Sequence, residues 1–254
     1  MLLIHKIPVL TDNYIFIIEN TLSKEAAVVD PAISRPIIDF ARSKKLSITS
    51  ILNTHHHWDH IGANDELKRI FNCKIYGYSN DKHRIPGITH EVISGETISV
   101  CGHDFFVEDI PGHTLGHIYF FNPTNKILFS GDTLFSLGCG RLFEGTPQQM
   151  YESLKKITTL PKETKIYFSH EYTLSNLEFS QSIVSNLSAL NTYGEYIREN
   201  IGSHFSSCPS TIEKELNCNL FLNCHQDWLK QALNSPDETD LETFTRLRVL
   251  KDHF

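Results

Sequence analysis

The sequence predicts a strand-rich α/β domain over residues 1–172, followed by a helical domain over residues 173–254. Two patterns carry this prediction. Short β-branched and aromatic runs bounded by turn residues recur through the first two-thirds of the chain. Beyond residue 172 the apolar residues recur at helical spacing instead. The length of 254 residues, of which 40% are hydrophobic, is enough for one large core and an appended second domain.

The first expected elements are two strands and a helix. YIFIIE (14–19) and AAVVD (26–30) are strand-like runs, and Pro31 ends the second one. Ser34 is a suitable N-cap for a helix that runs to about Lys45.

The strand expected next, SITSILNT (47–54), delivers a loop rich in histidine. Apolar Leu67, Ile70 and Phe71 predict a helix directly after that loop. Thr146-Pro147-Gln148-Gln149 is a capping-box start with proline at the first helical position, so a helix is expected to about residue 160. Further strands are expected over 103–110, 118–122, 126–132 and 165–170.

The second domain is expected to consist of helices. Residues 173–202 show helical spacing of apolar side chains, and 238–251 do so again. Ser210-Thr211-Ile212-Glu213 predicts a capping box between these two segments.

Composition narrows the class of protein. The formal net charge of −7 disfavours a nucleic-acid partner. Residues 1–20 lack the unbroken apolar run of a secretory signal peptide, so none is expected. No stretch of the sequence reaches the ~18 apolar residues of a membrane helix. The six cysteines show no CxxC spacing, which indicates reduced, buried thiols in a cytoplasmic protein and disfavours a metal site at Cys218, Cys224 and His225. A monomer is expected.

The segment NTHHHWDHIGA (53–63) carries the most chemical information in the chain. His55, His57, Asp59 and His60 form the pattern His-x-His-x-Asp-His, and alternate side chains of an extended loop share one face. Imidazole and carboxylate ligands suit Zn²⁺, Fe or Mn²⁺, and the lack of thiolate argues against a closed structural zinc site. His56 is expected to face away from the metal.

Three further ligands are expected where other strands end. PGHTLGH offers His113, FSGDTLF offers Asp132 and YFSHEYT offers His170. We therefore predict His55, His57 and His113 on one metal, Asp59, His60 and His170 on a second, and Asp132 shared between them. His117 is expected to support the ligands without being one.

THHHWDH, PGHTLGH, GDTLF and SHEYT, in this order, resemble the metallo-β-lactamase superfamily. GCGRLFEGT (138–146), HEYTLSN (170–176) and RVLKDHF (248–254) narrow the resemblance, which covers essentially the whole chain, to the hydroxyacylglutathione hydrolase (glyoxalase II) family. The resemblance implies a four-layer αββα sandwich with two divalent metal ions, followed by a helical domain that helps to bind glutathione. Zn²⁺ is the expected metal.

The family also implies which residues meet the substrate. Its seven ligands match the seven named above. Arg141 corresponds to a basic residue that meets the glutathione moiety, and Phe143 stands where some members carry tyrosine. Tyr172 matches the tyrosine after the His-Glu pair, and Arg248 and Lys251 match a basic pair that holds the glycine carboxylate. Asn223 departs from the arginine that members often carry.

The implied reaction is hydrolysis of the thioester S-D-lactoylglutathione to D-lactate and glutathione, the second step of methylglyoxal detoxification. A water shared by two divalent metals loses its proton near neutrality, so a metal-bridged hydroxide could attack the thioester carbonyl while Asp59 aims it. The alternatives within the superfamily are a persulfide dioxygenase with one iron, a lactonase, a β-lactamase and an RNA-processing nuclease. A non-catalytic protein that binds metal or glutathione conjugates is the alternative of another class, and an absence of turnover would identify it.

Overall fold

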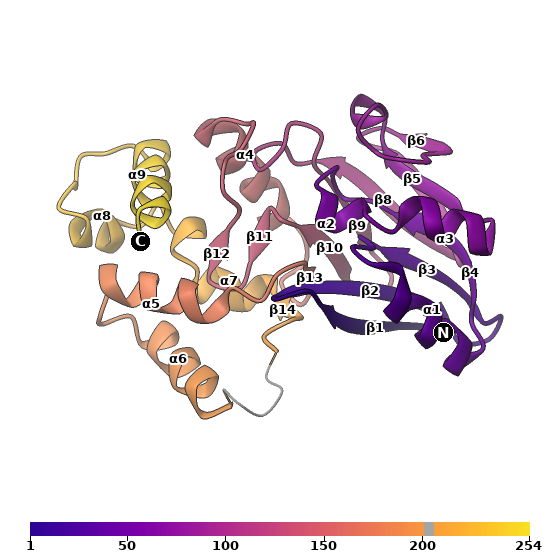
Figure 1. The fold of residues 1–254 in the computed structure, drawn as a ribbon. Coiled ribbons are helices and arrows are strands. Elements are labelled where there is room, and N and C mark those ends of the chain that lie inside the picture. The colour runs from indigo at the N-terminus through magenta and orange to yellow at the C-terminus, as the bar shows by residue number, and fades with distance from the viewer. Residues whose placement is uncertain (201–205) are drawn as a thin grey trace. The chain divides into compact units, whose positions relative to one another are not determined.

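A computed structural model describes residues 1–200 and 206–254 of the chain, which form two compact units. Unit 1 comprises Met1–Asp109 and Gly116–Gly131, and unit 2 comprises Ile110–Leu115 and Asp132–Phe254. Figure 1 labels most of the helices and strands of both units. A domain boundary at residue 172 stays a prediction.

Unit 1 begins with a mixed sheet whose strands follow the chain order. β1 to β3 are antiparallel, and β3 to β6 are parallel. The strands are β1 (Leu2–Val9), β2 (Asn13–Asn20), β3 (Glu25–Val29), β4 (Ser47–Leu52), β5 (Lys74–Tyr78) and β6 (His90–Val92). Parallel neighbours need crossover connections, which α1 (Ser34–Lys44) and α3 (Asn64–Phe71) provide. These helices pack on the sheet through a core that includes Ile17, Val28, Ile37 and Leu67.

A second set of strands covers the opposite face of β2. It consists of β7 (Thr97–Val100), β8 (His103–Asp109), β9 (Ile118–Asn122) and β10 (Ile127–Gly131), which are antiparallel in the order β10-β9-β8-β7. The rings of Phe16 in β2 and Phe129 in β10 lie 5.6 Å apart. Residues 13–19 of β2 are accordingly all buried, because both faces of the strand are covered.

Unit 2 is mainly helical in its later part. Two short strand pairs, β11 (Leu134–Phe135) with β12 (Gly138–Cys139) and β13 (Lys165–Phe168) with β14 (Ser210–Thr211), are antiparallel. The helices are α4 (Pro147–Thr158), α5 (Thr173–Ile183), α6 (Ser188–Asn200), α7 (Ile212–Cys218), α8 (Asp227–Ala232) and α9 (Asp240–Asp252), with 3-10 turn η2 at Leu220–Leu222. Leu137, Leu177, Leu190 and Ile197 belong to a core that joins the hairpin to α5 and α6. Within the described ranges, no helix has the length and apolar character to cross a membrane.

The predicted helix starts have mixed outcomes. The capping box at Thr146 is confirmed, since Thr146 Oγ1 accepts from the Gln149 amide and the Gln149 side chain accepts from the Thr146 amide. The cap at Ser34 is wrong, because Ser34 is the first residue of α1 and Ile33 is its N-cap; the Ser34 hydroxyl donates to Glu66 of α3. The capping box at Ser210 is also wrong: Thr211 caps α7. The helical segment predicted over 173–202 is divided into α5 and α6, and its last two residues lie outside the described ranges.

Candidate functional site

The histidine loop (residues 55–60) follows β4 in unit 1. His55 is fully buried, and its ring centroid lies 4.7 Å from that of His57 and 4.0 Å from that of His60. The short helix α2 (Trp58–Ile61) carries Asp59 and His60 in a single turn. The loop therefore gathers three of the predicted imidazole ligands within one unit, because the chain bends into α2 directly after an extended segment.

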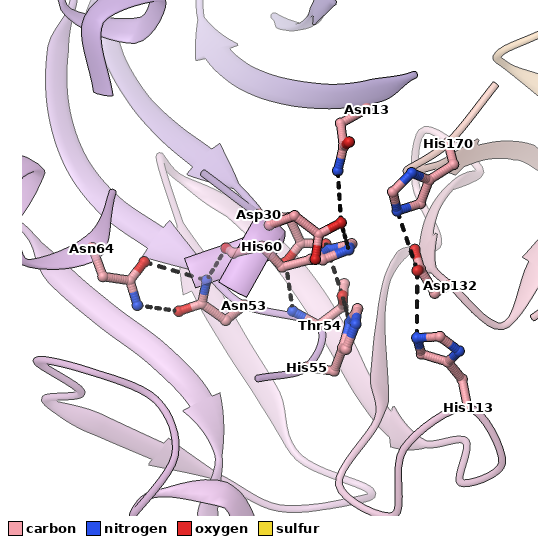
Figure 2. Close-up of polar contacts among 11 residues, drawn as sticks. Asn13, Asp30, Asn53, Thr54, His55, His60, Asn64, His113, Asp132 and His170 are labelled. Carbon is pink, nitrogen blue, oxygen red and sulfur yellow. Dashed lines mark hydrogen bonds and ion pairs between the residues drawn. The ribbon is translucent and has the colours of Figure 1, made fainter. Parts of the chain in front are cut away.

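Asp30 orients two of these histidines. This buried carboxylate follows β3, and its backbone φ of 51° is one that aspartate tolerates better than most residues. It accepts from the Thr54 amide at 2.8 Å and from Thr54 Oγ1 at 2.7 Å, and it lies 3.2 Å from His60 Nδ1 (Figure 2). Because the Thr54 hydroxyl hydrogen is directed at Asp30, Thr54 Oγ1 accepts from His55 Nδ1, 3.1 Å away. The Nε2 atom of His55 is then the basic nitrogen, as a metal ligand requires.

Asn13 orients Asp59. The Asn13 amide, at the start of β2, donates to Asp59 Oδ2 at 3.0 Å, and the same oxygen lies 3.7 Å from His60 Nε2. Sequence reasoning missed both Asn13 and Asp30. The available signal was a polar residue at a strand end, in TDNY and in AVVD.

A pair of buried amides secures the end of the histidine loop. The Asn53 side chain donates to the His60 carbonyl at 3.0 Å, and Asn64 donates to Asn53 Oδ1 at 2.8 Å (Figure 2). The first bond provides a donor to a carbonyl in the last turn of α2, and the second fixes the Asn53 side chain that makes it.

Unit 2 brings together the other three predicted ligands. Asp132 follows β10, His113 lies in the segment before β9, and His170 follows β13. Asp132 Oδ2 lies 3.4 Å from His113 Nε2 and 3.2 Å from His170 Nε2, and all three side chains are buried (Figure 2). Gly140 lets its own backbone lie close to that of Asp132, since a Cβ at position 140 would collide with the Asp132 backbone oxygen.

The donor atoms in unit 2 fit a divalent cation. His113 Nδ1 donates to the Arg141 carbonyl at 2.9 Å, so a neutral His113 ring turns the lone pair of Nε2 toward the Asp132 carboxylate. Two acceptors that face each other repel, and a cation between them removes the repulsion. Nitrogen and oxygen donors without thiolate suit Zn²⁺, Fe or Mn²⁺.

The described residues able to join a metal-binding group are all histidine or aspartate. They are His55, His57, Asp59, His60, His113, Asp132 and His170. The six cysteines are all buried and form no disulfide. Burial raises the pKa of Cys139 and Cys218 to about 11, so these two are protonated thiols near neutral pH. His225 is exposed and lies beside the Gln226 amide.

Two aromatic residues predicted to meet the substrate lie beside ligands in unit 2. The Phe143 ring centroid lies 5.2 Å from that of His113, and its side chain is 63% exposed. Tyr172 stacks on His170 with ring planes 4° apart. Asn223 has no free side chain to replace an arginine, because its amide donates to the Leu216 and Asn219 carbonyls.

The three predicted cations gather around Asp252 at the end of α9. Arg141 Nε lies 3.6 Å from Asp252 Oδ1, and the Arg248 guanidinium lies 2.9 Å from the same oxygen. Arg248 is only 4% exposed and also donates to the Cys139 carbonyl. Lys251 donates to Ser175 Oγ at 2.8 Å. Burial, and then the charges of Arg248 and Arg141, lower the pKa of Lys251, so this cluster has a surplus of positive charge that favours an anion.

Residues 10–170 match the family model of the metallo-beta-lactamase superfamily, and residues 171–254 match that of the hydroxyacylglutathione hydrolase C-terminus. The chain is 43% identical to the hydroxyacylglutathione hydrolase of Photobacterium profundum over 257 residues, which cover 100% of both chains. It is 39% identical to that of Rhodospirillum rubrum, covering 99% of this chain and 98% of the relative.

Solved structures confirm the predicted fold class. ETHE1 from Myxococcus xanthus superposes with a TM-score of 0.70 at 21% identity, over 97% of this chain and 90% of that chain. The BLEG-1 B3 metallo-beta-lactamase superposes with a TM-score of 0.68 at 23% identity, over 87% and 99%. At these identities the likeness shows the fold alone.

Proposed function

Because this chain belongs to the hydroxyacylglutathione hydrolase family of the metallo-β-lactamase superfamily, we propose that it hydrolyses S-D-lactoylglutathione to D-lactate and glutathione. The observation that carries the proposal is identity of about 40% over the full length of such hydrolases, together with the family's own C-terminal region over residues 171–254. The family implies binding of divalent metal.

Seven residues are proposed to hold two metal ions, and Zn²⁺ is the expected element. Each ion has three ligands of its own, and the seventh residue is shared by both ions. They are His55, His57 and His113 for one ion, Asp59, His60 and His170 for the other, and Asp132 for both. Two bound divalent ions would supply a water of lowered pKa and polarisation of the thioester carbonyl.

The chain's own part in the reaction is to orient groups and to bind the substrate. Asp59, held by Asn13, accepts a hydrogen bond from the attacking water and aims it at the carbonyl carbon. The leaving thiolate needs little help from a protein acid, because a free thiol has a pKa of ~8.5. The reaction therefore depends on positioned acceptors more than on a proton donor.

Glutathione presents carboxylates, and the cations around Asp252 suit them. Arg141 and Lys251 are proposed to meet a substrate carboxylate directly. Arg248, which was expected to hold the glycine carboxylate together with Lys251, is buried and contacts the Cys139 carbonyl and Asp252, so its proposed part is instead to keep the end of α9 in place. Phe143 and Tyr172 are proposed to line the path to His113 and His170. A monomer in the cytoplasm is the proposed state of the protein.

The test is the rate of S-D-lactoylglutathione hydrolysis by the purified protein, with bound metal counted on the same sample. Rapid turnover at about two metal ions per chain, lost on chelation and restored by Zn²⁺, is the expected result. About two bound ions without turnover would overturn the substrate assignment and direct attention to persulfide oxidation and RNA cleavage.

A further inference from the structure

His56 lies between His55 and His57 in the histidine loop, and its side chain is largely enclosed by other residues of unit 1. Its ring centroid lies 5.0 Å from that of His57, and its side chain is only 16% exposed. Its Nδ1 atom lies 3.1 Å from Oδ2 of Asp81. A histidine that merely pointed away from the ligands would need no such partner.

Asp81 is a buried carboxylate that ends the 3-10 turn η1 (Ser79–Asp81), which follows β5. Its side chain is 2% exposed, and its second oxygen pairs with the Arg84 guanidinium, which is 38% exposed. Burial of a carboxylate is costly unless it is paired and hydrogen-bonded. The two partners, His56 on one oxygen and Arg84 on the other, supply that compensation.

Gly116 shows how closely the chain packs around this carboxylate. A Cβ at position 116 would collide with all three atoms of the Asp81 carboxylate group. The next residue, His117, stacks on His55 with ring centroids 4.6 Å apart and planes 17° apart. The histidine loop is thus contacted by Asp81 through His56 and by His117 through His55.

We propose that His56 and Asp81 are positioning residues for the metal site: the Asp81 carboxylate fixes the His56 ring, and the fixed ring sets the backbone that spaces His55 from His57. The inference rests on the proposed role of His55 and His57 as ligands. His55 and His57 flank His56 directly, so a rotation of the His56 backbone would move both rings. Gly116 is needed because any side chain there would displace Asp81.

Metal retention by the holoenzyme under graded chelator tests this proposal. His56→Ala, Asp81→Ala and Gly116→Ala are each expected to release metal at about tenfold lower chelator, the scale seen when a group that orients a ligand is removed. The double variant of His56 and Asp81 is expected to be no weaker than either single variant, because the two act as one unit. Asp39→Ala, which removes an exposed carboxylate from its pair with Arg35, is the matched control and should retain metal like the wild type.

Wild-type retention in all three single variants would overturn the proposal, and so would additive losses in the double variant. A merely structural role would lower the melting temperature without changing retention well below it, and this outcome also counts against the proposal. Gly116→Ala keeps Asp81 and His56 in the chain, so the test does not depend on the folding of Asp81→Ala. The measurement needs no substrate, so a failure of the proposed hydrolysis would leave it standing.

Discussion

Glu215 on α7 is predicted to hold the hairpin that leads from Asp132 to Arg141. The carboxylate is 0% exposed and accepts from the Leu137 amide at 2.8 Å, from Asn219 Nδ2 at 3.1 Å and from the Ser210 hydroxyl. Leu137 lies in the turn between β11 and β12, with a φ of 60° that is rare for leucine. The turn is therefore kept in a strained conformation by an acceptor from a distant helix.

The loss of unfolding free energy in Glu215→Ala can be worked out from the buried donors that would lose their acceptor. The Leu137 amide and the Ser210 hydroxyl are both fully buried and would lose their acceptor, at about 1–3 kcal/mol each. Asn219 would keep two backbone carbonyls as partners. The sum is about 2–6 kcal/mol, before any cost of the cavity. This is a large part of the ~5–15 kcal/mol that stabilises a typical domain.

Glu215→Gln separates the charge from the packing. Burial raises the pKa of Glu215, and the three donors oppose this without reversing it. A folded-state pKa above the unfolded value of 4.5 means that the contribution of Glu215 is fully present below pH 4.5 and is lost as the pH rises through the folded pKa. The stability difference between wild type and Glu215→Gln should therefore shrink as the pH rises from 4.5.

Urea unfolding followed by circular dichroism, at several pH values, measures both effects. Glu213 is exposed on the same helix, so Glu213→Ala and Glu213→Gln are the controls and should change the free energy of unfolding by less than about 0.5 kcal/mol. A loss below about 1 kcal/mol in Glu215→Ala would refute the role of the carboxylate in holding the turn. A difference that grows with pH in Glu215→Gln would show that the donors outweigh burial.

Asn13→Ala is expected to lower kcat by about ten- to a hundredfold with little change in KM, because Asp59 loses its orientation; a raised KM would instead place Asn13 against the substrate. Asp132→Ala should lose metal and nearly all hydrolysis, and metal analysis that finds about two ions at full rate would exclude the bridging role. The lowered pKa of Lys251 predicts that KM rises at a lower pH than an ordinary lysine would give, as the ammonium loses its proton. Lys251→Arg should move that rise to higher pH, and an unchanged KM profile would remove Lys251 from the substrate site.

Structural features that depend only on residues close together in the sequence could be predicted from it. The capping box at Thr146 is satisfied within one turn, and the strand at residues 118–122 is apolar up to its last residue, Asn122, so both appear as expected. β1 was not predicted, because His5, Lys6 and Pro8 interrupt its apolar pattern. Its strand conformation depends on antiparallel pairing with β2 along its whole length. The caps at Ser34 and Ser210 failed because each helix starts one residue away from the expected position: Ser34 is the first residue of α1, and Thr211 is the N-cap of α7.

The same distinction applies to the candidate site. Histidines and aspartates at strand ends, in a spaced pattern, point to a metal from the sequence alone. The residues that orient them do not form a pattern. Asn13 lies 46 residues from Asp59, and Asp30 lies 24 residues from Thr54, so only the folded sheet brings these partners together. An amide or a carboxylate at a strand end is too common to be singled out without that contact.

Three buried carboxylates, Asp30, Asp81 and Glu215, have one feature in common. Each accepts from two or three donors, and each holds a segment that carries or adjoins predicted ligands. An apolar side chain in place of such a carboxylate would leave its donors unsatisfied, and it would not fix the direction of a ring or an amide. A fully satisfied carboxylate does fix it, since its lone pairs select the donors that face it. The cost of burying these three carboxylates is therefore offset in part by hydrogen bonds that also fix segments next to the predicted metal ligands.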